Sequence, residues 1–160
     1  QGRLYVVDVL RGCVEIFSPD GTHLGGLECG AGELNRPSNV TVDQSGRVYV
    51  TDSLNFRIVV FGADQKVLAS FGEIGDGPGH FARPRGVAVD SQGHIYVSDA
   101  AFDNVQVFDL TGNLLLFFGG SGKGPGKFNL PAGLFFDREG RLYVADTYNR
   151  RVQIYEYLPQ

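Results

Sequence analysis

The chain of 160 residues has no methionine, no tryptophan, only two cysteines and no long hydrophobic run. Its apolar runs, such as 114–118, are far shorter than the roughly 20 residues of a membrane-spanning helix. Helical heptads of alanine and leucine are also missing. The net charge of −4 is small, which argues against a strong attraction to nucleic acid or anionic membranes. Because methionine is absent, we expect Gln1 not to be the original start and the chain to be a fragment or a processed product.

Glycine, valine, isoleucine, phenylalanine and tyrosine are abundant instead, and they recur in a repeated unit. The segments 37–61, 84–108 and 131–155 align without gaps, and a shortened copy covers 3–17. The prolines that begin the three full copies follow one another at a period of 47 residues. A fixed period of this length, built from short apolar runs, indicates a repeat architecture.

Each unit predicts four short strands. In the third copy these are 86–90, 94–98, 105–108 and 114–118, and Asp-x-x-Gly turns recur between the first two strands of each full unit. Several strands are apolar on both faces, which suits sheets that are covered on both sides. The sequence therefore predicts an all-β protein over 1–160, a β-propeller of four-stranded antiparallel blades. Its units are 1–27 (partial), 37–71, 84–118 and 131–160 (partial), joined by glycine-rich loops.

The glycine-rich loops 72–81 and 119–128 resemble phosphate-binding loops only superficially. A phosphate loop opens a helix, whose amide groups bind the anion, whereas a strand follows here. Phe81, Phe128 and Leu34 occupy one equivalent position, and we expect them to fill the gap between neighbouring blades.

The run D-[ST]-x-N-x-R-[IV]-x-[VI]-[FY], present at 52–61 and 146–155, resembles the NHL repeat. The preceding P-x-G-[VL]-x-x-D and the linking F-G-x-x-G-x-G-P-G-x-F resemble it too, so the resemblance covers essentially the whole chain. It departs from the family pattern where Phe56, Asp103 and Arg150 replace the histidine of the name-giving triplet. The resemblance implies a ring of six blades, of which about three and a half are present. It does not name an activity.

Four aspartates end the second strand of each unit and suggest a ring of carboxylates: Asp8, Asp52, Asp99 and Asp146. Because they recur in every unit, we interpret them as structural residues that hold the following loop by hydrogen bonds to its backbone. The alternative, a functional carboxylate ring, stays open.

The three histidines, His23, His80 and His94, occupy three different repeat positions, so we expect no common metal and no cofactor. Relatives of the NHL family include amidating lyases with a histidine-ligated metal and lactonases with calcium. An enzyme whose site lies in blades not present is therefore an alternative function.

Cys13 and Cys29 belong to the first unit only, and both fall in loops expected on the same face of a propeller. A disulfide between them is geometrically possible, and two buried or free thiols are the alternative. A disulfide would indicate an oxidising compartment.

The loops of the fourth unit carry basic and aromatic residues that could contact a partner. The candidate contacts are Lys123, Lys127, Tyr148, Arg150 and Arg151, together with Phe102 of the third unit. The alternative is ordinary solvated loop charge.

These observations favour a non-catalytic interaction or scaffold propeller with a protein partner at its loops and no membrane span. By resemblance, the glycine-rich linkers suggest a periplasmic or secreted subunit of a larger assembly. RNA binding, which some NHL domains perform, is an alternative that ranks lower because the loop charges nearly cancel.

Overall fold

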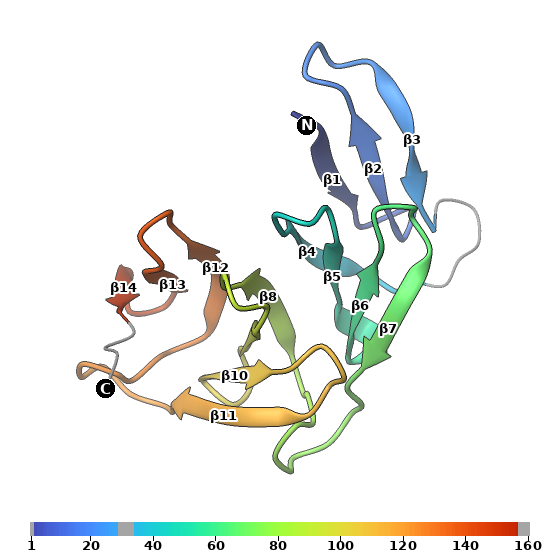
Figure 1. The fold of residues 1–160 in the computed structure, drawn as a ribbon. Coiled ribbons are helices and arrows are strands. Elements are labelled where there is room, and N and C mark those ends of the chain that lie inside the picture. The colour runs from blue at the N-terminus through green and yellow to red at the C-terminus, as the bar shows by residue number, and fades with distance from the viewer. Residues whose placement is uncertain (1, 29–33, 157–160) are drawn as a thin grey trace.

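The computed structural model describes residues 2–28 and 34–156, which form antiparallel strands and one three-residue 3-10 helix, η1 (Ser53–Asn55) (Figure 1). None of the described residues forms a helix with the length and hydropathy that crossing a membrane requires. The strands are β1 (Leu4–Asp8), β2 (Cys13–Phe17), β3 (His23–Leu27), β4 (Pro37–Val42), β5 (Val48–Asp52), β6 (Arg57–Phe61), β7 (Val67–Phe71), β8 (Pro84–Val89), β9 (Ile95–Asp99), β10 (Asn104–Phe108), β11 (Leu114–Gly119), β12 (Pro131–Phe136), β13 (Leu142–Asp146) and β14 (Arg151–Tyr155).

The strands form four sheets that we call blades 1 to 4. Blade 2 has the order β4-β5-β6-β7, and blade 3 has β8, β9, β10 and β11 in the same arrangement. Within the described residues, blade 1 has three strands (β1-β2-β3), which match the second to fourth of the unit, and blade 4 has three (β12-β13-β14), which match the first to third, as the repeat alignment predicts. Successive strands pair as hairpins, so every blade is a simple antiparallel meander.

The blades follow one another in an arc, with the first strand of each full unit innermost (Figure 1). β4 lies beside β8, and β8 beside β12. The described strands of blades 1 and 4 do not pair with each other, so the arc stays open between them. These features confirm the predicted propeller architecture.

Apolar clusters between successive blades form the core. One joins blades 1 and 2, a second joins blades 2 and 3, and a third joins blades 3 and 4. Leu34, Phe81 and Phe128 each belong to one of these clusters and are almost completely buried. The prediction that these three residues fill the gaps between blades is therefore confirmed.

Connections leave the blades on two sides. We call the side with the β5–β6, β9–β10 and β13–β14 loops and the glycine-rich linkers the loop face. The opposite side, the turn face, carries the Asp-x-x-Gly turns. There Gly46, Gly93 and Gly140 have φ between 80° and 89°, a region that side-chain-bearing residues rarely adopt. These turns need glycine at that position, as the sequence motif predicts.

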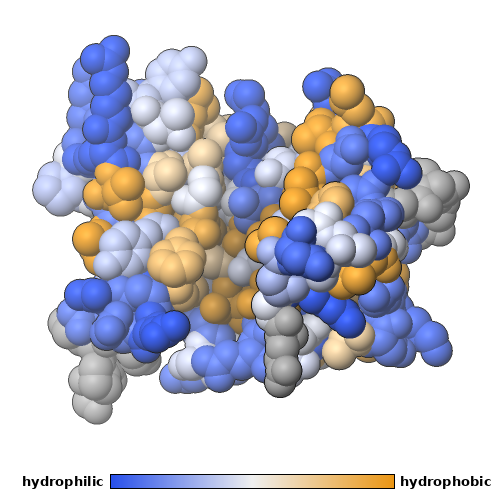
Figure 2. All heavy atoms as spheres, turned by 90° about the horizontal axis from the view of Figure 1, so that it is seen from above, coloured by the Kyte–Doolittle hydropathy of each residue, from blue (hydrophilic) through white to orange (hydrophobic). Residues whose placement is uncertain are grey.

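Apolar side chains are exposed on the outward faces of the two end blades. Leu4 and Val6 are about half exposed on blade 1, and Phe135, Val152 and Ile154 more so on blade 4. Figure 2 looks onto the open side of the arc and shows hydrophobic surface mostly in a middle band, between hydrophilic residues along the upper and lower rims. The end faces thus have the apolar character of the buried faces between blades.

Truncating a residue between two blades should destabilise the arc more than truncating an outer one. Phe81→Ala removes a fully buried ring from the cluster between blades 2 and 3, and we expect a loss of about 3–5 kcal/mol in the free energy of unfolding. Phe117→Ala, on the exposed side of β11, should cost less than about 1 kcal/mol. Urea denaturation followed by circular dichroism measures both; equal losses would contradict this assignment of the core.

Candidate functional site

Buried aspartates organise the loop face. Asp52, Asp99 and Asp146, which end β5, β9 and β13, are completely inaccessible to solvent. Asp99 accepts hydrogen bonds from the backbone amides of Ala82 and Arg83 in the preceding linker, and of Ala101 and Phe102 in the following loop. Each carboxylate therefore joins two segments of the loop face. This agrees with the structural interpretation of these three aspartates, whereas Asp8 is only partly buried and, among the described residues, accepts hydrogen bonds from Leu10 and Arg11 of the following loop alone.

In blades 2 and 4 the same aspartate is also paired with an arginine. Arg57 Nε donates to Asp52 Oδ2 at 2.8 Å, and Arg151 Nε donates to Asp146 Oδ2 at 2.7 Å. Burial opposes ionisation of Asp146, but hydrogen bonds from Asn149, Asn129 and Arg151 outweigh it and hold the pKa of that carboxyl below its usual value. The charged form of Asp146 is therefore the form that stabilises the fold.

The glycine-rich linker of blade 4 is bound to the β13–β14 loop. Asn149 Nδ2 donates to the carbonyl of Gly122, and Arg151 Nη2 donates to the carbonyls of Gly124 and Lys127, all at 2.8 Å. Gln153 Nε2 donates to the Lys127 carbonyl as well. Linker and loop thus form one fixed surface, although five of the ten residues from 119 to 128 are glycine.

This fixed surface presents most of the predicted partner contacts. Lys123, Lys127, Tyr148 and Arg150 are all exposed, and Tyr148 is the most exposed aromatic residue in the described part of the chain. No described carboxylate forms an ion pair with any of the three cations. We call these four residues the blade-4 basic patch.

The other two predicted contacts are placed differently. Arg151 is only partly exposed, and its guanidinium holds Asp146 and the linker, so its role in this structure is structural. Phe102 is half-buried in the β9–β10 loop of blade 3, apart from the blade-4 basic patch. A partner contact at either residue stays a prediction.

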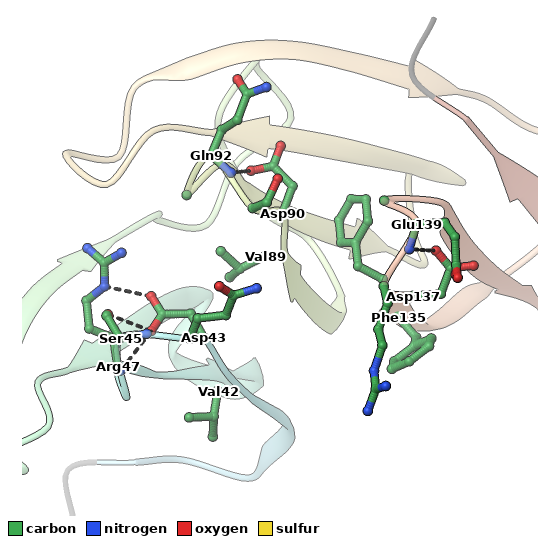
Figure 3. A pocket seen from close by; sticks show the side chains of 16 residues that line it. Val42, Asp43, Ser45, Arg47, Val89, Asp90, Gln92, Phe135, Asp137 and Glu139 are labelled. Atoms are coloured by element: carbon green, nitrogen blue, oxygen red, sulfur yellow. Dashed lines mark hydrogen bonds and ion pairs between the residues drawn. The ribbon is translucent and has the colours of Figure 1, made fainter. Parts of the chain in front are cut away.

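The turn face contains a hollow of about 630 Å³. Its wall is made by the turns after β4, β8 and β12, with Val42, Val89 and Phe135 among the lining side chains (Figure 3). Every dashed interaction in Figure 3 joins groups of the same turn, and none crosses the hollow.

The three aspartates of these turns, Asp43, Asp90 and Asp137, are fully engaged locally. Asp43 accepts hydrogen bonds from Ser45, Arg47 and Tyr49, and these outweigh the effect of burial and lower the pKa of its carboxyl. Burial and the bond to Asp43 raise the pKa of Tyr49. These three carboxylates close turns, and their hydrogen bonds are made within those turns.

The three histidines do not converge. His94 Nδ1 lies 2.8 Å from Asp90, His80 Nε2 lies 3.0 Å from Glu73, and His23 Nε2 lies 2.6 Å from Glu15. Within residues 2–28 and 34–156, no group of three or more histidine, cysteine or acidic side chains is arranged to hold a metal ion.

Cys13 is fully buried at the start of β2. Its predicted disulfide partner, Cys29, lies outside the described residues, so that pairing stays a prediction.

A second hollow, of about 650 Å³, opens on the loop face and was not singled out from the sequence. It lies where blade 2 meets blade 3, and Arg36, Arg83 and Arg85 line it. A comparison of the repeats could have indicated it, because the units differ at the residue before the leading proline. Two of these arginines precede the prolines that begin β4 and β8, where the next unit has Leu130.

Replacing Asp146 by asparagine should weaken both blade 4 and its linker. We expect Asp146→Asn to lower the free energy of unfolding at pH 7 by about 2 kcal/mol or more, because Arg151 loses its charged partner. The folded pKa lies below the ordinary value of 3.8, so this stabilisation is complete above the unfolded pKa and is lost as pH falls through the folded pKa. Urea titrations between pH 7 and pH 2.5 should show the difference from the parent protein shrinking below about pH 4.

The matched control is Asp64→Asn, since Asp64 is mostly exposed and lies 3.9 Å from Lys66. Its effect should stay within about 0.5 kcal/mol. If the loss of unfolding free energy in Asp146→Asn did not change with pH, the conclusion that the charged form of Asp146 stabilises the fold would be contradicted.

Two family models match the sequence. A model described as a 6-bladed beta-propeller matches residues 29–114, just over half of the chain, and an NHL repeat model matches residues 128–155. No curated protein matches.

Solved structures match at low identity. A streptogramin B lyase superposes with a TM-score of 0.71 at 12% identity, over 98% of this chain and 51% of its own. A catalytically inactive virginiamycin B lyase from Staphylococcus aureus, with quinupristin, gives 0.68 at 10% identity over 98% and 53%. A protein of unknown function from Bacteroides caccae gives 0.60 at 17% over 91% and 54%. The chain spans about half the length of these structures, and at such identities the likeness shows the fold alone.

Proposed function

The chain belongs to the six-bladed β-propeller family, and from this premise we propose that it is a non-catalytic interaction propeller that docks an acidic segment of a partner protein on its loop face. The observation that carries the proposal is the blade-4 basic patch. Three exposed cations and an exposed tyrosine lie on the linker and the β13–β14 loop, which hydrogen bonds hold together.

The fixed backbone of the blade-4 basic patch favours tight docking. Binding a partner with a mobile loop costs conformational entropy, whereas this linker and loop are already tied together by Asn149 and Arg151. Arg150 has φ of 54°, and Phe56 and Asp103 at the equivalent positions have φ of 54° and 52°, so the architecture fixes its backbone as well. The patch is therefore presented in one arrangement.

The charges of the blade-4 basic patch select the chemistry of the partner. Exposed cations without ion-pair partners attract carboxylates over long range and accelerate association. An exposed tyrosine among them adds a large contact area at a low entropic cost. Together they fit a segment with several glutamates or aspartates around an apolar or aromatic residue.

A lyase activity, as named for two of the structural neighbours, is the second candidate. The described aspartates of the turns and strand ends serve local hydrogen bonds, and the described histidines are dispersed. This distribution favours the interaction role over catalysis by the described residues. The proposal extends to a subunit of a larger extracytoplasmic assembly, which a disulfide between Cys13 and Cys29 would support.

Fluorescent 12-residue peptides rich in Glu and Tyr test the proposal. Peptides of the same length in which Lys replaces Glu serve as the control. We expect at least one acidic peptide to bind with an affinity that falls as salt rises, and the triple variant Lys123→Glu/Lys127→Glu/Arg150→Glu to weaken it by about tenfold or more. Arg151 is kept, because replacing it would disturb Asp146. Fluorescence anisotropy measures binding, and circular dichroism confirms folding.

The matched control is Lys66→Glu/Arg138→Glu, which reverses exposed charges on the turn face. These should leave peptide affinity unchanged. A triple variant that binds as well as the parent would contradict the proposal. So would an RNA oligonucleotide that binds in preference to every acidic peptide and depends on the same three residues.

A further inference from the structure

The loop-face hollow between blades 2 and 3 concentrates positive charge, and the described part of the chain supplies it with no counter-charge. Arg36, Arg83 and Arg85 line it, and none of the lining residues within 2–28 and 34–156 is acidic. No described carboxylate forms an ion pair with any of the three guanidinium groups, whereas Arg47, Arg57, Arg141 and Arg151 all have one. This clustering occurs in a chain whose net charge is −4.

The repeat shows that the fold does not need these arginines. Arg36 and Arg83 stand at one repeat position, which Leu130 occupies in blade 4. Arg85 stands where the other units have Ser38 and Ala132. All three versions begin the same kind of innermost strand, so the cationic groups serve something other than the blade.

The backbone beneath the arginines is fixed from both blades. Ser38 Oγ donates to the carbonyl of Arg85 at 2.8 Å, and Ser53 Oγ lies 2.9 Å from the carbonyl of Pro84. The amide of Arg83 donates to the buried Asp99. These bonds join the two blades beneath the hollow. The arginine side chains therefore extend from a backbone that is held in place.

Apolar groups complete the hollow. Val9 and Leu54 are 41% and 48% exposed there, and Phe56 adds a half-buried ring. A volume of about 650 Å³ falls in the range of about 300–1,000 Å³ that small-molecule sites occupy. The lining therefore combines a cationic part with an apolar part.

We propose that this hollow binds a small molecule that carries an oxyanion group on an apolar body. The planar guanidinium forms paired hydrogen bonds to carboxylate, phosphate or sulfate groups, and three of them that no described carboxylate pairs suit one such group. The apolar body contacts Val9, Leu54 and Phe56. This site is separate from the blade-4 basic patch, so a failure of one proposal would not affect the other.

Isothermal titration calorimetry on the full-length protein tests the site with four probes: benzoate, phenyl phosphate, inorganic phosphate and neutral benzyl alcohol. We expect saturable binding of at least one aromatic anion, weaker binding of inorganic phosphate and none of benzyl alcohol. A preference between benzoate and phenyl phosphate identifies which oxyanion the hollow takes.

The repeat supplies variants that the fold already accepts. Arg36→Leu and Arg83→Leu copy Leu130, and Arg85→Ser copies Ser38. Each substitution should lower the affinity for the anionic probe by about tenfold, which is the effect of losing one charged bidentate contact. Arg138→Ala, an exposed arginine of the turn-face hollow, removes the same charge and should change nothing. No saturable binding of any anionic probe, or equal affinity in all four variants, would overturn the proposal.

Discussion

The buried carboxylate at the end of the second strand in blades 2, 3 and 4 is the interaction on which the loop face depends. Asp52, Asp99 and Asp146 each accept a backbone amide from the linker that enters the blade, at Asn35, Ala82 and Asn129 respectively. The same carboxylate accepts groups of the loop that leaves the strand. One charged group, excluded from water, therefore fixes two segments that are far apart in sequence. Because a buried carboxylate without partners is costly, these hydrogen bonds are required by the fold.

Repeated and unrepeated residues have different roles in this chain. The former stabilise the fold, and the latter determine the chemistry of the exposed surface. The repeated residues stack the blades and hold the turns: the apolar strand positions, the plug at Leu34, Phe81 and Phe128, and the Asp-x-x-Gly motif. The unrepeated residues lie on the surface that these supports hold in place. The charged groups of the blade-4 basic patch and of the arginine-lined hollow stand at positions whose residue type differs between units, as Arg36 and Arg83 differ from Leu130, so their charges can vary without altering the blades.

Much of the fold could be predicted from the sequence because a repeat presents the same pattern several times. The period, the hairpin turns and the plug residues all follow from comparing copies. Strand ends differed by one or two residues; for example, the first strand of blade 3 begins at Pro84 and not at Gly86. The candidate site was harder. Arg151 was predicted to contact a partner, yet it holds Asp146, and its repeat counterpart Arg57 holds Asp52. The loop-face hollow escaped prediction because its three arginines come from two units that only the packed structure brings together.

Native-state hydrogen exchange of the backbone amides of Asn35, Ala82 and Asn129 tests most directly whether buried carboxylates hold the loop face. The account predicts that these amides exchange as slowly as amides of the central strands, although they lie in glycine-rich linkers. It also predicts that, of these three amides, only that of Asn129 exchanges faster in the Asp146→Asn variant than in the parent protein. Exchange of all three at the rate of exposed loop amides in the parent protein would contradict the account.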